Sequence, residues 1–560
     1  MIDPAAGLDA AGASPSHPAP EVDPRGEEAA PQDRIGRATA VITFWNLVSR
    51  LTGFARVVAV SAALGITRLG DTYQSANEVS NIMFELLAGG ILYAVLVPTF
   101  VALLDKGRRR QAADLAGALL GRMLIVLVVL VVIAGFAGPW IMRLFTIGAG
   151  SADIRSRQIE VGSFLLWFFL PQLLLYAVGA VATALLQADR RFVAAAVAPV
   201  FNNVVVMVTM GLFALTADTR VADTLHLTTG QKLVLGAGTS AGVLLMVLVP
   251  VLAARRAGLA GRPRLRTGAP DGLASLARKG VWGAGHVGLN EVLIFVTYVL
   301  ASRVGGGQAA FQVAFTFFLL PHAILGNPIF TALFPRLSTH AARDDRDQFC
   351  RDLSFGLRTT IIMILPAGGL LAVLALPGLT VLRGFGQFDA RGVVLVAEVL
   401  AAYSFGLLGY TAFFLLTRAS YALDDARTPT MVNLGVTVAA VVGMAAASSL
   451  VTGNAKVVVL GLVHAVAVSG GSLVLLGRLH GRLGRPIPFV AALLRAGAAT
   501  AVACAVAWAA STALGWPSRS GALLAVTVAA GTALLAYGVA LTALRAPELA
   551  AVRAKVSGRF

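Results

Sequence analysis

Residues 112–138 read AADLAGALLGRMLIVLVVLVVIAGFAG, an almost uninterrupted apolar run. A helix that crosses a bilayer needs roughly 20 mostly apolar residues, so this run is long enough to span one. About fourteen such segments follow one another along the chain, the second of them at 73–104. Only 13% of the 560 residues are charged and 57% are hydrophobic, far from the balance of a water-soluble domain. The sequence therefore predicts an all-α polytopic membrane protein.

Two pairs of similar segments reveal an internal repeat. The pairs are PTFVALLDKGRRRQAADL (98–115) with PRLSTHAARDDRDQFCRDL (335–353), and LLQADRRFVAAAVAPVFNN (185–203) with RASYALDDARTPTMVNL (418–434). Their offset is nearly constant, because Pro98 and Pro335 lie 237 positions apart and Asn203 and Asn433 lie 230 apart. An even number of spans separates the copies, which predicts two six-helix lobes in the same orientation, related by a pseudo-two-fold axis along the membrane normal. The last two spans lie outside the repeat.

The expected organisation has five regions. In chain order they are a disordered cytoplasmic tail (1–36), an N-lobe of helices 1–6 (37–254), a C-lobe of helices 7–12 (270–482), a C-terminal helix pair of helices 13–14 (487–545) and a second cytoplasmic tail (546–560). The first tail is rich in Pro, Ala and acidic residues and has no apolar run, a composition typical of disorder.

Arginine-rich loops indicate how the chain is oriented. They recur after every second span, for example at 108–110, 255–256 and 478–485. Because such loops stay on the cytoplasmic side of a membrane, we expect both termini to be cytoplasmic. The same loops explain the net charge of +17 without nucleic-acid binding. The two cysteines, Cys350 and Cys504, fit neither a disulfide framework nor a metal site.

The first two spans carry polar residues into the membrane. The first contains Arg50 and Arg56, although a charged side chain at mid-bilayer costs at least about 2.5–3.5 kcal/mol. In the second span, four polar residues recur at the spacing of one helical face, and these are Gln74, Glu78, Asn81 and Glu85. Such a polar stripe should face water or protein instead of lipid.

Two interpretations of these residues stay open. In the first, Arg50 and Arg56 form ion pairs with Glu85 and Glu78 of the neighbouring antiparallel helix. In the second, the stripe lines an aqueous cavity and the arginines bind an anionic substrate, because a guanidinium binds phosphate oxygens through two parallel hydrogen bonds. Glu291, in the seventh span, is a candidate for a proton or cation relay. The sequence has no metal-ligand cluster, phosphate-binding glycine loop or nucleophile triad, which favours a transporter without a cofactor over an enzyme.

Four segments carry a resemblance to a known family. They are NLVSRLTGFARVVAVSAALG (46–65), GDTYQSANEVSN (70–81), LLQADRRFVAAAVAPVFNN (185–203) and RASYALDDARTP (418–429). Together they resemble the MurJ (MviN) family, bacterial lipid II flippases of the multidrug/oligosaccharidyl-lipid/polysaccharide exporter superfamily. The resemblance implies fourteen helices, a central cationic cavity, and a groove for a polyprenyl tail at the two C-terminal helices. The implied substrate is undecaprenyl-pyrophosphate-linked lipid II, flipped across the bacterial cytoplasmic membrane for peptidoglycan synthesis by alternating access.

The resemblance also implies roles for individual residues. Arg50 and Arg56 match the two cavity arginines of the family's first helix, and Asp71 matches its acidic residue after that helix. Three further residues of the second span would shape the substrate-binding cavity, and these are Glu78, Asn81 and Glu85. The implied partners are the lipid-linked substrate and the membrane lipids around it.

The chain departs from the family's pattern at several positions. An arginine that many relatives carry in the second helix is replaced here at Phe84 or Glu85, and an arginine of the eighth helix is replaced by Thr316. Fewer arginines would hold a pyrophosphate less strongly. Some relatives bind sodium between the seventh and eleventh helices, where Glu291 and Asn433 are the nearest candidates.

These departures keep alternative functions open. One is export of another lipid-linked glycan, or ion-coupled exchange of cationic drugs, which the acidic residues of the stripe favour. Coupling to Na+, H+ or the membrane potential is expected for either kind of transport. Another alternative is a membrane scaffold that recruits cell-wall synthesis or division proteins, and it predicts that neutralising Arg50 and Arg56 leaves function intact.

Overall fold

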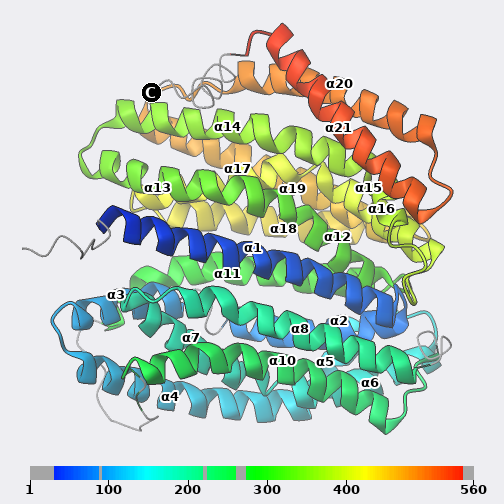
Figure 1. The fold of residues 1–560 in the computed structure, drawn as a ribbon, viewed down its shortest axis with the longest axis horizontal. Helices are drawn as coiled ribbons and strands as arrows, with labels where there is room; N and C mark the ends of the chain where they lie inside the picture. Colours follow the sequence, from blue (N-terminus) through cyan, green and yellow to red (C-terminus); the bar gives the residue numbers. More distant parts are fainter. Residues whose placement is uncertain (1–30, 87–90, 218–223, 260, 262–272, 547–560) are drawn as a thin grey trace, which may run out of the picture.

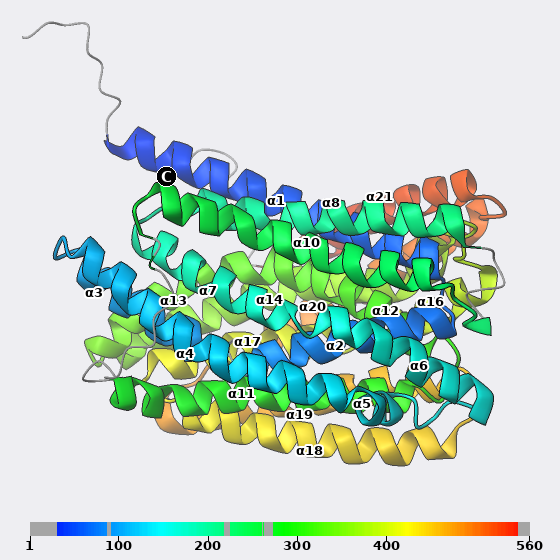
Figure 2. The same cartoon turned by 90° about the horizontal axis from the view of Figure 1, so that it is seen from below.

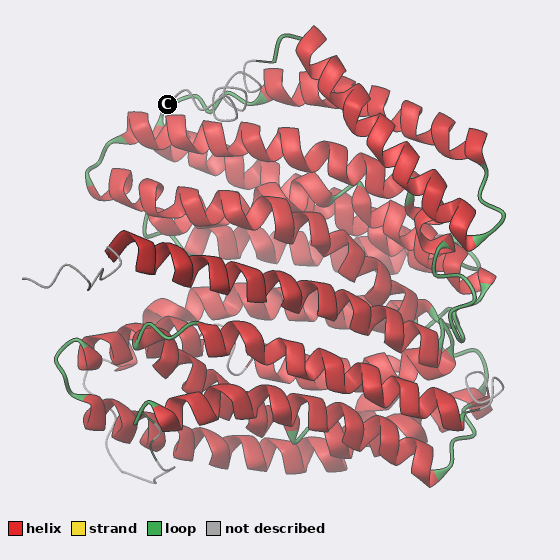
Figure 3. Cartoon of the chain, viewed as in Figure 1, coloured by secondary structure: helices red, strands yellow, loops and turns green. Residues whose placement is uncertain are grey.

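The computed structural model describes residues 31–86, 91–217, 224–259, 261 and 273–546. Over these residues the chain is built from helices and has no strand (Figure 3). Twelve helical stretches among these residues are long and apolar enough to cross a membrane, and the pair α16 (Ala390–Ser404) and α17 (Leu407–Ala422), bent by 48°, makes a thirteenth span. Helices α2 (Arg68–Phe84) and α3 (Ile91–Leu104) occupy the position of the predicted second span, 73–104, but residues 87–90 between them lie outside the described part. The predicted all-α polytopic membrane fold is confirmed.

The N-lobe contains the first half of the helices. They are α1 (Pro31–Leu64), α2 (Arg68–Phe84), α3 (Ile91–Leu104), α4 (Arg109–Phe136), α5 (Gly138–Phe145), α6 (Ala152–Phe169), α7 (Gln172–Ala188), α8 (Val193–Thr216) and α10 (Thr229–Arg256). Helix α1 begins at Pro31, so residues 31–36 of the predicted disordered tail are helical. The rest of that tail, 1–30, and residues 547–560 lie outside the described residues.

The C-lobe follows in the same order. Its elements are α11 (Leu273–Ala301), α12 (Gly307–Pro321), the π-helix η2 (His322–Gly326), α13 (Asn327–Ala342), α14 (Arg346–Val373), α15 (Ala375–Thr380), α16 (Ala390–Ser404), α17 (Leu407–Ala422), α18 (Arg427–Leu450) and α19 (Ala455–Leu483). In Figure 1 the two lobes lie side by side, with α1 running between them. Figure 2 shows that the long helices of both lobes keep one common direction.

The repeat appears in the structure as an equivalent hydrogen bond in each lobe. In the N-lobe, Nδ2 of Asn203 on α8 donates to the carbonyl oxygen of Ser49 on α1 at 3.2 Å. In the C-lobe, Nδ2 of Asn433 on α18 donates to the carbonyl oxygen of His286 on α11 at 3.1 Å. Amide side chains of this kind join helices inside membranes, where no water competes for the bond. Helix α8 is therefore fixed to α1 in the N-lobe by the same contact that fixes α18 to α11 in the C-lobe.

The two C-terminal helices, α20 (Val490–Leu514) and α21 (Arg519–Ala543), pack against each other at the edge of the C-lobe. Their contact contains a row of buried alanines, including Ala499, Ala503, Ala529 and Ala533. Small side chains let two helix backbones approach closely inside a bilayer. Helix α20 also packs against α14, which attaches the pair to the C-lobe (Figure 1).

Candidate functional site

A polar cavity of about 220 Å³ lies inside the bundle where the two lobes meet. Helices α1, α2, α7, α8 and α10 form most of its wall, and α12 of the C-lobe contributes one residue. Its polar lining residues are Arg56, Tyr73, Gln74, Asn77, Asn81, Tyr176, Asn202, Thr239 and Gln312. Buried cavities hold water or polar groups only where several hydrogen-bonding partners converge, and this wall supplies them.

A second cavity of about 390 Å³ adjoins the first, and Asn81 and Tyr176 line both. Glu85, at the end of α2, opens onto this second cavity. Three of the four residues of the polar stripe, Gln74, Asn81 and Glu85, thus line one of the two spaces. The helical spacing of these residues had located the side of α2 that faces away from lipid.

Glu78, the fourth residue of the stripe, is nearly inaccessible. Its side chain accepts a hydrogen bond from Nδ2 of Asn81 at 3.3 Å, and the residue is 9% exposed. Glu291 on α11 interacts electrostatically with both Glu78 and Glu85. We call these three glutamates, whose charges affect one another between α2 of one lobe and α11 of the other, the acidic cluster.

Neither Arg50 nor Arg56 of α1 forms an ion pair within the described residues. The pairs of Arg50 with Glu85 and of Arg56 with Glu78, which the first interpretation expected, are absent from this part of the chain. Arg56 lines the polar cavity. Arg50 is exposed and interacts electrostatically with His322 of the C-lobe. The cavity interpretation fits this geometry, and the assignment of both arginines to substrate binding stays a prediction.

Asp71 lies outside both cavities, in contrast to its expected role in substrate binding. Its carboxylate is fully buried in the first turn of α2. It accepts hydrogen bonds from the backbone N–H groups of Gly306 at 2.8 Å, Gln308 at 2.9 Å and Ala309 at 3.0 Å, at the start of α12. A carboxylate at a helix N-terminus satisfies N–H groups that have no partner within the helix. Asp71 therefore joins the N-lobe to the C-lobe.

Other hydrogen bonds surround Asp71 at the same end of the bundle. Oγ of Ser75 on α2 donates to Oε1 of Gln308 at 2.8 Å, and the guanidinium of Arg68 donates to the carbonyl oxygen of Ser302 at 3.0 Å. We call these residues, with Asp71 and Gly306, the cross-lobe contact. It lies where α1 ends and α2 begins. We call this the distal end of the bundle, opposite the end where α1 begins and α21 ends (Figure 1). The two lobes are therefore joined at the distal end.

The two residues expected to form a sodium site lie in different surroundings. Glu291 belongs to the acidic cluster, whereas Nδ2 of Asn433 donates to Oδ1 of Asn290 at 3.1 Å. That amide is also bonded to the carbonyl oxygen of His286, so it acts as a helix-joining group. Among the described residues, no group of three or more His, Cys, Asp or Glu side chains could hold a metal ion.

The positions where arginine was expected have other roles. The ring of Phe84 lies 5.1 Å, centroid to centroid, from the ring of Tyr176 and lines the second cavity. Oγ1 of Thr316 donates to the carbonyl oxygen of Gln312 within α12. One position is therefore aromatic and the other is a hydroxyl already bonded to its own helix.

Six polar residues of the first cavity were not predicted from the sequence. They are Tyr73, Asn77, Tyr176, Asn202, Thr239 and Gln312. The hydroxyl groups of Thr239 and Tyr73 are hydrogen-bonded at 2.8 Å, which fixes α10 against α2. For the residues outside α2, the signal that could have found them is a polar residue within an otherwise apolar span, which is rare enough inside membranes to indicate a function or a buried contact.

The chain was compared with known proteins in sequence and in structure. The family model described as "Lipid II flippase MurJ" matches residues 60–526. A "Probable lipid II flippase MurJ" of Rhizobium meliloti (strain 1021) is 27% identical over 508 residues, which cover 89% of this chain and 90% of the relative. A "Lipid II flippase MurJ" of Burkholderia cenocepacia is 28% identical over 408 residues, which cover 71% of this chain and 76% of the relative.

Solved structures share the fold at lower identity. A lipid II flippase MurJ in an inward closed conformation superposes with a TM-score of 0.72 at 17% identity, over 91% of this chain and 99% of that one. An inward-facing multidrug resistance transporter of the MATE family gives a TM-score of 0.61 at 13% identity, over 80% of this chain and 98% of that one. These likenesses show a common architecture. Since the family model matches most of its length, the chain belongs to the MurJ family of lipid II flippases.

Proposed function

We propose that the chain moves lipid II across the bacterial cytoplasmic membrane by alternating access of its two lobes. The observation that carries the proposal is Arg56, a guanidinium without a carboxylate partner among the described residues, in a polar cavity between the lobes. Its place in the family of lipid II flippases supplies the substrate. The proposed activity is transport, and no residue is assigned a role in a covalent step.

Electrostatics favours an anionic headgroup in this cavity. Arg56 is half-buried. A charge partly withdrawn from water is stabilised by a partner, so an arginine that no carboxylate of the described residues neutralises is available for an anion. Hydrogen bonds between arginine and phosphate oxygens are charge-assisted and often bidentate. Arg50, at the boundary with the C-lobe, would meet the same pyrophosphate when the lobes move.

Orientation and conformation follow from the same proposal. The arginine-rich loops lie at the end of the bundle where α1 begins and α21 ends, which the positive-inside rule makes cytoplasmic. The cross-lobe contact would then close the periplasmic end. Transport requires that this contact breaks, so that the headgroup can leave on the other side.

The lipid tail needs a path outside the polar cavity. An apolar pocket of about 210 Å³ lies between α14, α17, α19 and α20, lined by Leu357, Leu408, Leu473 and Leu493 among others. We assign the polyprenyl chain to this side of the C-lobe, next to the C-terminal helix pair. A long hydrocarbon tail would stay among apolar side chains while the headgroup crosses.

The acidic cluster supports a second candidate, ion-coupled export of a cationic substrate. Glu78, Glu85 and Glu291 lie close enough to interact, and intramembrane carboxylates commonly serve as proton or cation relays. In a flippase the same cluster would couple transport to Na+ or H+. The two candidates differ in whether transport needs Arg56 or only the glutamates.

A depletion and rescue experiment separates these candidates. The chain, R56Q, R56K and the control R143Q would be expressed in cells depleted of their own lipid II flippase, with growth and lipid II at the outer face as readouts. Losing a charge-assisted contact of about 1.5–3 kcal/mol should weaken headgroup binding by on the order of 10- to 100-fold, so R56Q should fail. R56K keeps the charge but not the planar fork and should rescue in part.

Arg143 is exposed on α5 and lies away from the cavity, so R143Q removes the same charge without touching the site. Failure of the unaltered chain to export lipid II would refute the flippase. Rescue by R56Q would favour the scaffold, and loss of cation transport in E291Q with lipid II export intact would favour the antiporter.

A further inference from the structure

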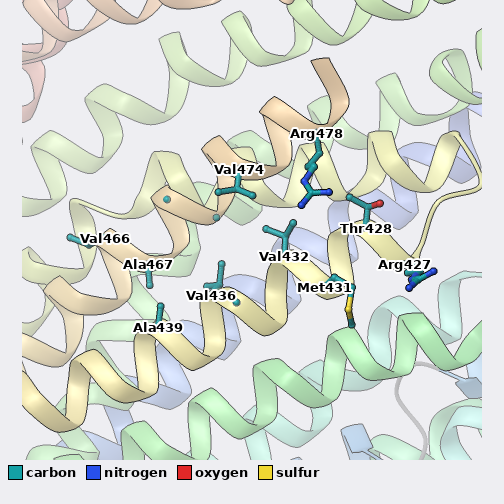
Figure 4. A pocket seen from close by; sticks show the side chains of 13 residues that line it. Arg427, Thr428, Met431, Val432, Val436, Ala439, Val466, Ala467, Val474 and Arg478 are labelled. Carbon is teal, nitrogen blue, oxygen red and sulfur yellow. The ribbon is translucent and has the colours of Figure 1, made fainter. Parts of the chain in front are cut away.

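A large groove on the C-lobe lies apart from the transport cavity. It has a volume of about 770 Å³ and runs between α18 and α19. Its wall is apolar along most of its length, with Met431, Val432, Val466 and Val474 facing it. Figure 4 shows Arg427 and Arg478 toward one end of the groove and Val466, Ala467 and Ala439 toward the other.

The length of the groove matches half a membrane. It extends along α18 from Arg427 to Ala439, and along α19 from Val466 to Arg478. At 1.5 Å per residue each of these stretches is about 18 Å long. One leaflet of the hydrocarbon core is about 15 Å thick. A single acyl chain can therefore lie along the groove with its headgroup at the arginine end.

The glycines of the groove leave room that helix packing does not require. A Cβ atom at Gly435 or Gly470 would meet no other atom within 4 Å. Gly in a helix costs about 0.5–1 kcal/mol relative to Ala, so these positions are not explained by contacts within the protein. Both residues line the groove, and an occupant from outside the chain would contact their exposed backbone.

The charge at one end of the groove is positive and uncompensated within the described residues. Arg427 and Arg478 are exposed and form no ion pair in this part of the chain, and no acidic residue lines the groove. The nearby carboxylate of Asp425 is already bonded to Arg482 and to the backbone N–H of Thr428. The guanidinium of Arg427 lies 5.7 Å from the ring centroid of Trp282, which positions it at the groove mouth.

We propose that this groove binds an acidic phospholipid of the surrounding leaflet. One acyl chain lies between α18 and α19, and Arg427 and Arg478 hold the phosphate. Basic pockets between helices on the cytoplasmic side of membrane proteins are suited to anionic headgroups. A polyprenyl chain is far longer than the groove, so the transported lipid fits it less well than a phospholipid does. The site lies outside the transport cavity and does not depend on the proposed substrate.

Native mass spectrometry of the full chain in detergent tests the proposal. The protein would be titrated with phosphatidylglycerol and with phosphatidylcholine of the same acyl chains. We expect phosphatidylglycerol to bind more tightly, and R427Q/R478Q to weaken its binding by about 25-fold, the product of about five-fold for each basic residue near an anionic headgroup. The matched control R255Q/R256Q removes two exposed arginines at the end of α10 and should leave binding unchanged.

A second variant keeps the charges and fills the groove. G435L/G470L places side chains where the structure has open space, so the fold should be retained while both lipids bind more weakly. Equal binding of the two phospholipids, or equal losses in R427Q/R478Q and its control, would overturn the proposal. Unchanged binding in the filled variant would also overturn it. So would displacement of phosphatidylglycerol from the groove by undecaprenyl phosphate at lower concentration.

Discussion

Replacing Asp71 with alanine should open the distal end of the protein. The carboxylate accepts three buried backbone N–H groups, from Gly306, Gln308 and Ala309. Each buried donor left without a partner costs about 1–3 kcal/mol, and the three costs overlap because the donors adjoin. We therefore expect about 3–5 kcal/mol of destabilisation that acts only on the state in which the lobes are joined.

A shift of this size is measurable. About 5.5 kcal/mol converts a 1:99 equilibrium into 99:1, so D71A should make the distally open state common. The assay places a cysteine at Gln74 in the polar cavity, in a chain whose Cys350 and Cys504 are replaced. A membrane-impermeant thiol reagent, added from the distal side, should label this cysteine much faster in D71A than in the parent.

Asp389 offers a matched control for this experiment. It also caps a helix, since its carboxylate accepts the N–H of Gly392 at 2.7 Å, but it makes this bond within one lobe. D389A should cost about 1 kcal/mol of stability, as the loss of an N-cap does, without changing the labelling rate. Equal labelling rates in D71A and D389A would refute the reasoning that the cross-lobe contact holds the distal end closed.

Three further predictions concern other parts of the chain. G306A should lower the thermal stability and raise distal labelling, because Gly306 has φ +81° and a Cβ there would lie 2.2 Å from the carbonyl oxygen of Ile66; unchanged values in both measurements would contradict the assigned strain. N433L and its repeat equivalent N203L should each lower stability by about 1 kcal/mol without altering sodium dependence, and a sodium effect confined to N433L would restore the ion site. Burial alone would raise the pKa of Asp189 and of Asp425, but in each case the partners outweigh it and the pKa is lowered. The partners of Asp189 are Arg109 and Arg191. Those of Asp425 are the Thr428 N–H and Arg482. Their stabilisation should therefore be complete above the unfolded pKa of about 3.9 and be lost as the pH falls through the lower folded values, so acid unfolding should be shallower in D189N/D425N than in the parent.

Much of the fold was predictable from the sequence because it depends on hydrophobicity and repetition. Runs such as 112–138 need a bilayer whatever surrounds them, and α4 (Arg109–Phe136) lies where that run predicts a helix. The repeat offset of 237 positions also separates Ser49 from His286, the two carbonyl groups that accept the equivalent asparagine amides. Periodicity likewise identified the polar side of α2.

The site was less predictable because its contacts join residues far apart in the chain. Asp71 carries the charge expected of a cavity residue, and only the approach of α12 shows that its carboxylate caps a helix of the other lobe. The same holds for Asn433, whose partner is Asn290 and not the neighbouring Glu291. Gln312 stands out as a polar residue in an apolar span, but nothing in the sequence shows that it reaches the cavity from the opposite lobe.

The matching amide bonds of Asn203 and Asn433 have a mechanical consequence. They hold α8 against α1 in one lobe and α18 against α11 in the other, so each lobe should rotate as a rigid body. The conformational change of a transport cycle would then be concentrated at the interface between the two lobes. Substitutions at that interface should change the turnover rate. Substitutions that remove the amide bond of Asn203 or Asn433 should chiefly reduce the amount of folded protein in the membrane.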